Sequence, residues 1–491
     1  MGVRKLRMPG FSILLQCTLA VVLVALAVLS IQLVWLAGIR MFASPRRLRL
    51  PLLPDEALPD VLVQLPVCDE GNLALRVAAA AARLDWPKDK LSIQLLDDGP
   101  AHKHDALVTA VREIIPADVN LAIMRRGERV GFKAGNLAHG LKHSQAPYVA
   151  IFDADFVPPS NFLRRTVPTL VADQRLAFVQ ARWGHANRNR NWLTRAQGFL
   201  LDSHFSVEQE ARFRAGLPMS FNGTAGVWSR DAIENGGGWT GDTLTEDLDL
   251  SIRCALKGWQ TAFVTDLEVP GELPETAAAW RAQQARWTKG HAQCARKLLP
   301  KIWLSNFPLW KKTAMTLQIT QFAFYLLAGA SAIISLTLMA MGVVYLKAVG
   351  ALGLSVTAIG IGASLFYLCL GQKMLDRDNE PNFIGSLIAA MVFPSGLVLS
   401  NARATYEAFA GTPMDFARTP KGNVTYAGGW RGSPEILTGI MLPVFALTEQ
   451  AWSAPFFIIA AAGLLSIGAM GWSGTQRAAV TDASAQRLPG E

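Results

Sequence analysis

Acidic residues follow three apolar segments in the first third of the chain. The pairs are Asp69 and Glu70, Asp97 and Asp98, and Asp153 and Asp155. In the stretch FDADF (152–156), strand alternation directs both aspartates to one side. Two close carboxylates repel each other unless a cation lies between them, and hard oxygen ligands suit Mg²⁺ or Mn²⁺ on a diphosphate. Asp153 and Asp155 are therefore candidate metal ligands, although an Asp at a strand end is often only a turn former or a helix cap.

A further carboxylate lies in TEDLDL (245–250). Group transfer with inversion needs one carboxylate to take the proton of the attacking hydroxyl, and Asp247 is our candidate for this general base. The alternative is that Thr245, Glu246 and Asp247 only cap a helix. Both interpretations are compatible, because a helix start would also fix the position of the carboxylate.

The stretch QQARW (283–287) adds a cation and an aromatic ring. In a helix, Gln283, Arg286 and Trp287 share one face. Arg286 can stabilise the negative charge that grows on a leaving diphosphate, and Trp287 offers a flat face on which a sugar ring can stack. The alternative for Trp287 is a membrane-interface residue beside a cation.

The elements that must position these residues lie in residues 60–270. Strand-like runs such as VLVQLPV, LSIQLLD and PYVAIF alternate with helix-like runs such as NLALRVAAAA. This alternation predicts an α/β domain with a mostly parallel sheet. Ligands of such sheets bind at the carboxyl ends of the strands, where the acidic pairs lie.

The remainder of the chain is apolar. Hydrophobic residues make up 51% of the 491 residues, charged residues only 17%, and the net charge is +9. The predicted spans or apolar segments are Phe11–Ile39, Thr313–Leu346, Ala348–Gln372, Phe383–Asn401, Ile436–Thr448 and Ala451–Gln476. The first run is too long for a signal peptide and has no clean cleavage site. The sequence shows no nucleic-acid-binding signature, and five scattered cysteines indicate reduced thiols.

Basic residues set the expected topology. Arginines follow the first span at positions 40, 46, 47 and 49, and Lys311 and Lys312 precede the second, which predicts a cytosolic location for residues 40–312. Whether the segment 383–410 crosses the membrane or lies along its surface stays open. Only the second alternative leaves FARTPKG (416–422) on the cytosolic side.

We expect four regions. They are an N-terminal transmembrane helix (1–40), a cytosolic catalytic domain (41–310), transmembrane and interfacial helices (311–475) with a gating loop (412–432), and a disordered tail (476–491).

The motifs occur in the order found in one family. They are LPVCDE (65–70), LLDDG (95–99), GFKAGNL (131–137), FDADF (152–156), VQARW (179–183), FNGTAG (221–226), TEDLDL (245–250) and QQARW (283–287). The chain resembles the membrane-bound processive family 2 glycosyltransferases of the cellulose-synthase-like kind, namely plant mannan and glucan synthases and their bacterial relatives. This resemblance implies a Rossmann-like GT-A domain inserted between transmembrane helices.

The resemblance also implies roles for individual residues. It assigns nucleotide-sugar binding to Pro66, Asp69, Glu70, Asp97, Asp98, Lys133, Asp153, Gln283, Arg286 and Lys421. It assigns acceptor binding to Phe221, Asn222, Gly223, Thr224 and Trp287, catalysis to Asp247, Glu246 and Arg286, and Mg²⁺ or Mn²⁺ to Asp153 and Asp155. Lys421 belongs to FARTPKG, which is similar to a gating loop except for Arg418. The FNGT form differs from the cysteine-containing form of cellulose synthases, so cellulose is not the expected product.

The expected reaction is the inverting transfer of a hexosyl unit, from UDP-glucose in preference to GDP-mannose, to a growing β-linked polysaccharide that leaves through the membrane helices. The alternative is a single addition to a lipid: ceramide, diacylglycerol or polyprenyl phosphate. We expect an integral protein of a bacterial inner membrane with a cytosolic catalytic domain. Any partner protein in the envelope stays unidentified.

Overall fold

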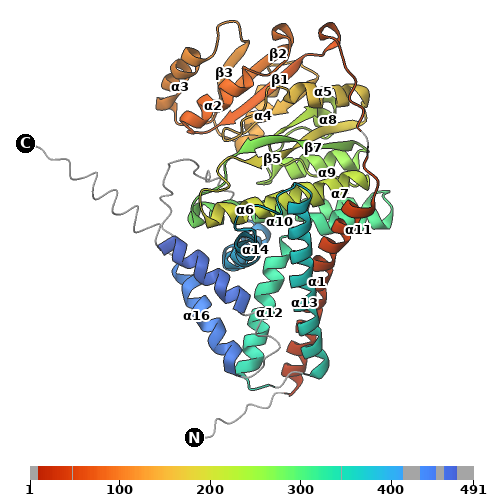
Figure 1. Cartoon of the computed structure of the whole chain (residues 1–491), viewed down its shortest axis with the longest axis vertical. Coiled ribbons are helices and arrows are strands. Elements are labelled where there is room, and N and C mark those ends of the chain that lie inside the picture. The colour runs from red at the N-terminus through yellow and green to blue at the C-terminus, as the bar shows by residue number, and fades with distance from the viewer. Residues whose placement is uncertain (1–8, 47, 344–345, 413–431, 449–457, 473–491) are drawn as a thin grey trace, which may run out of the picture.

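Three tiers of secondary structure make up the molecule. The structure is a computed structural model and describes residues 9–46, 48–343, 346–412, 432–448 and 458–472. Figure 1 shows an α/β domain above a layer of crosswise helices, and long helices below that layer. The fold thus combines the expected α/β domain with apolar helices that precede and follow it in the chain.

The upper tier is built on one mixed sheet of seven strands, in the order β3-β2-β1-β4-β6-β5-β7. The strands are β1 (Val61–Val67), β2 (Leu91–Asp97), β3 (Leu121–Arg125), β4 (Tyr148–Ile151), β5 (Leu176–His185), β6 (Gly226–Ser229) and β7 (Gln260–Gly271). Only β6 runs antiparallel to its neighbours, so the prediction of a mostly parallel sheet is confirmed.

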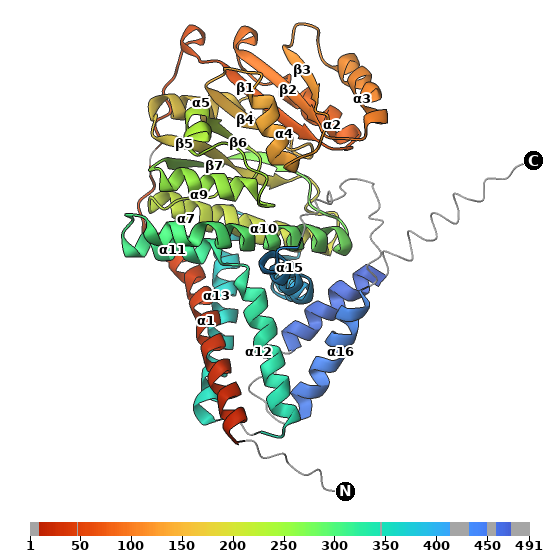
Figure 2. The ribbon, with the colours of Figure 1, turned by 180° about the vertical axis from the view of Figure 1, so that it is seen from behind.

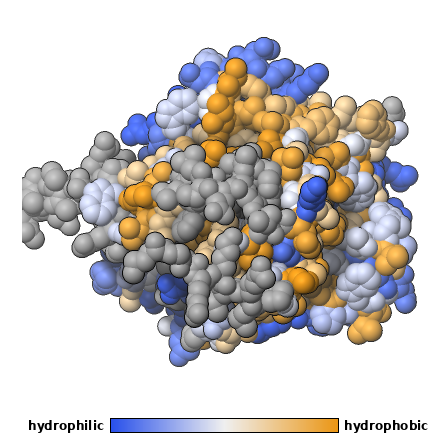
Figure 3. Space-filling view, turned by 90° about the horizontal axis from the view of Figure 1, so that it is seen from below, coloured by the Kyte–Doolittle hydropathy of each residue, from blue (hydrophilic) through white to orange (hydrophobic). Residues whose placement is uncertain are grey.

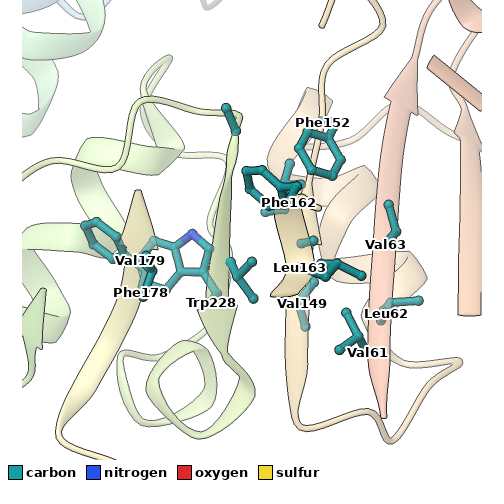
Figure 4. Packing of buried hydrophobic residues seen from close by; sticks show 14 of the residues in the cluster. Val61, Leu62, Val63, Val149, Phe152, Phe162, Leu163, Phe178, Val179 and Trp228 are labelled. Atoms are coloured by element: carbon teal, nitrogen blue, oxygen red, sulfur yellow. The ribbon is translucent and has the colours of Figure 1, made fainter. Parts of the chain in front are cut away.

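Helices cover both faces of this sheet. They are α2 (Asn72–Ala81), α3 (Ala101–Ile114), α4 (Phe132–Leu141), α5 (Phe162–Ala172), α8 (Arg230–Asn235) and α9 (Glu246–Leu256). Central strands that are covered on both faces read as continuous apolar runs, as VLVQLPV in β1 does. Figure 4 shows part of the resulting core, in which Val61, Leu62 and Val63 of β1 lie in one cluster with Val149 of β4 and Leu163 of α5.

The middle tier joins the sheet to the apolar helices. It consists of α6 (Trp192–Ser203), the π-helical turn η3 (His204–Gln209), α7 (Glu210–Arg214), α10 (Ala277–Leu304) and α11 (Leu309–Ile319). Figures 1 and 2 show these helices crosswise to the helices below. The motif QQARW lies in α10, so this tier carries part of the candidate site.

The lower tier contains the apolar helices. They are α1 (Pro9–Phe42), α12 (Ala323–Ala340), α13 (Lys347–Lys373), α14 (Phe383–Val392), the short turn η4 (Phe393–Leu397), α15 (Val398–Ala410), α16 (Ser433–Thr448) and the helix Ile458–Trp472. Four segments of the described chain are long and apolar enough to cross a membrane: Gly10–Phe42, Ala323–Ala340, Lys347–Lys373 and Phe383–Ala410. Figure 3 shows apolar side chains over much of the end of the molecule opposite the sheet, as expected for lipid contact.

The segment 383–410 differs from the other three candidates in its direction. It is divided at Pro394, and α14 packs on α6 whereas α15 packs on α10. Figures 1 and 2 show α14 and α15 nearly end-on beneath the middle tier, where α12 runs upright. Of the two alternatives, this geometry fits a segment along the membrane surface.

A buried ion cluster anchors α13 to the middle tier. The carboxylate of Asp202 in α6 is fully buried, contacts Arg188, and lies 3.2 Å from Nη1 of Arg377, which follows α13. Nη2 of Arg188 also donates to Oε1 of Gln372 at 2.9 Å. Burial opposes ionisation, but the nearby imidazole of His185 and the charges of both arginines hold the pKa of Asp202 well below its usual range. Paired charges thus link the middle tier, which contains α6, to the end of α13.

The sequence analysis missed some elements. The strand β3 was missed because it has only five residues, and its short apolar run LAIM is only partly buried. The apolar segment Phe383–Asn401 is divided at Pro394, because proline cannot donate the hydrogen bond that would continue α14. The described part of the last predicted span is Ile458–Trp472. FARTPKG with Lys421, and the predicted tail, lie outside the described residues.

Candidate active site

The three acidic strand ends open on one large cavity. Its volume is about 1010 Å³, and it extends from the carboxyl ends of β1, β2 and β4 past α10 to the lower tier. Asp98, Asp153 and Asp155 line it, as parallel strands that end at one edge of a sheet predict. Glu246, Asp247, Arg286 and Trp287 line the same cavity, so motifs far apart in sequence meet there.

One end of the cavity is lined by the loops after β1 and β2. Pro66, Glu70 and Asp98 contribute to its wall. Both carboxylate oxygens of Asp98 accept hydrogen bonds from Arg126, at 2.7 Å from Nε and 2.6 Å from Nη2. Glu70 accepts a hydrogen bond from the backbone N–H of Cys68. These pairs hold the two carboxylates in place, which suits the recognition of a nucleoside.

Two predicted nucleotide-binding residues do not reach the cavity wall. Oδ1 of Asp97 accepts the N–H of Gly99 at 2.7 Å, and Oδ2 accepts from Nδ1 of His104 at the same distance. Asp69 pairs with Lys103 at 2.9 Å. Asp97 therefore stabilises the turn after β2. Of the alternatives Asp97 and Asp98, the structure brings only Asp98 to the cavity.

Lys133 lies at the centre of the site. It belongs to α4, whose start is bent so tightly that a Cβ on Gly135 would collide with the carbonyl oxygen of Val130. Its Nζ lies 2.5 Å from Oδ1 of Asp153 and 3.9 Å from Oε1 of Glu246. Burial alone would lower the pKa of this ammonium, but the two carboxylates outweigh that effect and raise it. Lys133 is therefore a stable cation at the position expected for a diphosphate.

Asp247 occupies the first turn of α9, as expected. Its Oδ1 accepts the N–H of Leu248 at 2.8 Å, so the residue does interact with the start of the helix. Burial and the neighbouring carboxylate of Glu246 raise the pKa of Asp247 to about 7. A carboxylate with a pKa near neutrality is a better proton acceptor than an ordinary aspartate, which favours the role of general base.

This pKa predicts an acid limb in the pH profile. A general base acts only when deprotonated, so we expect kcat/KM to fall below the pKa of Asp247, about 7. In Glu246→Gln the neighbouring negative charge is lost, the pKa of Asp247 falls, and the limb should move to lower pH. Initial rates of sugar transfer between pH 5 and pH 9 would measure both profiles. A limb at the same pH in both proteins would contradict this assignment.

The motif QQARW places three side chains on the cavity wall. Gln283, Arg286 and Trp287 all line it, which agrees with their predicted common face on α10. Burial lowers the pKa of Arg286, while the negative charges of Glu246 and Asp153 act in the opposite direction. The guanidinium thus lies in the same field of carboxylates as Lys133, and the two cations together could bind a diphosphate.

The FNGT loop (221–224) brings three of its four residues to the cavity wall: Phe221, Asn222 and Gly223. The ring of Phe221 also packs against Phe178 and Trp228. Gly223 has a φ of +80°, which only glycine adopts easily, and its carbonyl oxygen accepts from Lys133 at 2.8 Å. Thr224 is fully buried and supports the site from behind, because its Oγ1 accepts the N–H of Asp153 at 2.9 Å.

The side chain of Asn222 is held at the cavity by two partners. Its Oδ1 accepts from Nε2 of Gln209 at 2.8 Å, and its Nδ2 lies 3.4 Å from Nε2 of His204. Both partners belong to η3. The sequence analysis missed them, because a π-helical turn has no apolar periodicity; single π turns inside helices often occur at functional sites.

Trp183 also lines the cavity, a role that the sequence left undecided. The centroid of its ring lies 5.0 Å from the ring centroid of Phe156 and 5.3 Å from that of Phe205. Together with Trp287 it gives the cavity two large aromatic surfaces.

The carboxylates that line the cavity fit a metal ion that takes some of its ligands from the protein and the others from a bound substrate. Asp153 and Asp155 both contribute to one wall. Among the residues that the structure describes, no three His, Cys, Asp or Glu side chains gather closely enough to enclose a metal by themselves. Mg²⁺ usually takes one or two carboxylates and completes its shell with water and phosphate oxygens, and this donor set matches that preference.

Comparisons with known proteins identify a matching family and related sequences. The family described as "Glycosyl transferase family group 2" matches residues 148–368. Glucomannan 4-beta-mannosyltransferase 1 of Oryza sativa subsp. japonica is 39% identical over 327 residues, which are 63% of this chain and 63% of that protein. Glucomannan 4-beta-mannosyltransferase 9 of Arabidopsis thaliana is 38% identical over 357 residues, 68% of this chain and 66% of the relative. The chain thus spans less than two thirds of the length of these relatives.

A solved structure supports the fold. The mannosyltransferase of Pyrobaculum calidifontis, determined in complex with GDP-Man and Mn²⁺, superposes with a TM-score of 0.53 and 21% identity, covering 76% of this chain and 97% of that chain. This likeness concerns the fold, and it agrees with the GT-A prediction.

Proposed function

Residues 148–368 belong to glycosyl transferase family group 2, and on this premise we propose that the protein transfers hexosyl units, mannose above all, from a nucleotide sugar to a growing β-linked polysaccharide. One observation carries the proposal. Asp247, Lys133 and Arg286 line a single cavity that continues among the apolar helices, so a transfer site opens directly on a passage toward the membrane.

The reaction needs one displacement. The oxygen of an acceptor hydroxyl attacks the anomeric carbon of the donor, the bond from that carbon to the phosphate oxygen breaks, and the configuration inverts. Asp247 takes the proton of the attacking hydroxyl. No second carboxylate is needed as a nucleophile, in contrast to retaining hydrolysis.

Cations stabilise the departing diphosphate. Lys133 and Arg286 are placed to bind its oxygens, where charge grows during the transfer. Mg²⁺ or Mn²⁺ held by Asp153 and Asp155 would supply further neutralisation of the diphosphate when bound. Asp98 and Glu70 would orient the nucleoside, and Trp287 would receive the ring of the acceptor sugar.

The orientation in the membrane follows from charge. The end of α1, which carries Arg40, and the helix α11, which carries Lys311 and Lys312, lie on the side of the α/β domain. Arg46, which follows α1, donates to Gln260 of β7. The positive-inside rule then favours a cytosolic catalytic domain. We propose that α14 and α15 lie along the membrane surface, which leaves α1, α12 and α13 as spans and returns the chain after Ala410 to the catalytic side.

The nature of the sugar is inferred from the relatives. Both plant proteins are named as mannosyltransferases, and the comparisons give no support to the expected preference for UDP-glucose. We therefore propose GDP-mannose as the main donor, a β-1,4 linkage as in the names of the relatives, and glucose as a possible second sugar.

Single addition to a lipid is the second candidate. Leu19, Leu23 and Leu26 of α1 line the lower part of the cavity, and such a surface would also receive an acyl chain. The two candidates differ in the product, because a lipid acceptor carries one sugar and stays extractable into chloroform.

An assay of products separates them. We expect the purified full chain in lipid nanodiscs with Mn²⁺ to incorporate radiolabel from GDP-mannose, at a higher rate than from UDP-glucose, into a polymer that β-mannanase degrades. Gel filtration and enzymatic digestion of the products would measure this. A chloroform-soluble product one sugar long would contradict the polysaccharide proposal, and preference for UDP-glucose would contradict the choice of donor.

A further inference from the structure

One face of α10 continues from Arg286 onto the segment that carries Asp247. Four residues follow Arg286 at helical spacing and contact the segment 240–249. They are Gly290, Gln293, Cys294 and Lys297. None of the four was among the predicted site residues. The helix that carries the cation of the candidate site therefore also holds the segment of the candidate base.

Gly290 allows α10 to approach Thr245 very closely. A Cβ at position 290 would lie 2.5 Å from Cγ2 of Thr245, 2.8 Å from its Oγ1 and 3.0 Å from its backbone nitrogen. Thr245 is buried and β-branched, so it has little freedom to turn away. Glycine destabilises the interior of a helix relative to alanine. Its presence in the middle of the 28-residue helix α10 is explained by this contact.

Hydrogen bonds fix the register of the contact. Oε1 of Gln293 accepts the N–H of Leu244 at 2.9 Å, and Sγ of Cys294 lies 3.3 Å from Oγ1 of Thr245. Thr245 is the N-cap residue of α9, yet within the described chain its side chain makes no capping hydrogen bond. The hydroxyl of Thr245 thus serves the contact with α10, not the start of its own helix.

Lys297 ties down both flanks of the segment. Its Nζ lies 2.8 Å from Oδ2 of Asp242 and 2.7 Å from Oδ1 of Asp249. Asp249 is fully buried and also pairs with Arg253 at 2.8 Å. Residues before and after Asp247 are therefore paired with the same lysine of α10, so the segment cannot shift along the helix without breaking ion pairs.

The chemistry of the proposed reaction makes this contact important. In an inverting displacement the base and the leaving group act on opposite sides of the anomeric carbon, so their separation must match the in-line geometry. A misplacement of about 1 Å can lower the rate by about 10²-fold. Asp247 belongs to α9 and Arg286 to α10, so the packing of these two elements sets the separation.

We propose that Gly290 and Gln293 are positioning residues, which hold the segment 243–245 against α10 and thereby set the distance between Asp247 and Arg286. The inference rests on the proposed role of Asp247 as the base and deepens it. Neither Gly290 nor Gln293 lines the cavity, so they act through this contact and touch no substrate.

Replacement of Gly290 by Ala tests the close contact in the full chain in nanodiscs. We expect kcat to fall about 10²-fold, because the added methyl group displaces the segment of Asp247, and the affinity for GDP to stay unchanged. In a Thr245→Ser background the nearest atom, Cγ2, is absent, so the same replacement should cost less. Initial rates with the donor that the product assay identifies give kcat, and calorimetry with GDP, or with UDP for a uridine donor, gives the affinity.

The matched control is Gly362→Ala in α13. There a Cβ would meet no atom of the described residues within 4 Å, and Gly362 does not line the cavity. This control should keep both kcat and the affinity of the parent.

A second pair of variants tests the hydrogen bond and does not depend on the folding of Gly290→Ala. Gln293→Leu leaves the N–H of Leu244 without its acceptor and should lower kcat about tenfold. Gln293→Glu keeps an oxygen acceptor at the same place and should retain most of the rate. Thermal melting would confirm that each variant is folded.

The outcomes separate this inference from the proposed function. Parental kcat in Gly290→Ala or in Gln293→Leu, an equal loss in the Thr245→Ser background, or a parallel loss of nucleotide affinity overturns the positioning role. If Asp247→Asn is inactive while Gly290→Ala is as active as the parent, only the positioning role is wrong. If Asp247→Asn keeps its turnover, the proposed base is wrong and the positioning role falls with it.

Discussion

Replacement of Asp247 by Asn is expected to lower kcat for sugar transfer about 10³-fold, in the range that a positioned general base contributes. Asparagine has nearly the same shape and can still interact with the start of α9, so the local structure should persist. It lacks the basicity that the buried carboxylate has through its raised pKa, about 7. The loss should therefore appear in kcat while the donor still binds.

Two measurements check this expectation. Transfer of radiolabelled mannose gives kcat, and calorimetry gives the affinity for GDP-mannose. The control is Asp266→Asn, an exposed carboxylate that pairs with Arg165 away from the cavity and whose loss should leave both quantities unchanged. If Asp247→Asn kept its turnover, Asp247 would only cap the helix.

Replacement of Arg286 by Gln should lower kcat by about 10²- to 10³-fold, the usual result of removing a group that stabilises developing charge. Arg286→Lys should retain part of the rate, because it keeps the charge but loses the planar fork that binds two phosphate oxygens. Removal of the cation also takes a positive charge away from Asp247, so the acid limb of Arg286→Gln should move to higher pH.

Initial rates across pH with a saturating donor measure both effects. The matched control is Arg296→Gln, on the same helix, whose Nη1 donates to the carbonyl oxygen of Ala408 at 3.2 Å and which does not line the cavity. If Arg286→Gln had the same kcat as the parent, Arg286 would serve only as a membrane-interface cation. If its acid limb stayed in place, the coupling to Asp247 would be refuted.

Arg286 and Trp287 are neighbours on α10, and both line the cavity. In the proposed reaction this one helix would therefore serve two substrates, with Arg286 at the diphosphate of the donor and Trp287 at the ring of the acceptor.

The sequence by itself predicted the α/β fold and the apolar helices, because these features depend on local patterns such as strand alternation and helical spacing. Acidic residues at strand ends and the order of the motifs also named the candidate site residues. Of these, Lys133, Asp153, Asp247 and Arg286 line one cavity, whereas Asp69 and Asp97 do not.

The tertiary structure alone decided which side chains face that cavity. Asp97 and Asp98 are neighbours, yet one stabilises a turn and the other lines the wall, because adjacent side chains at a strand end point in different directions. Packing of α14 on α6 and α15 on α10 gave the segment 383–410 its crosswise direction, which hydropathy left open. The cavity wall also includes Gln32, His204, Glu208, His291 and Gln318, and only long-range packing brings such distant positions to one cavity, since no local spacing encodes it.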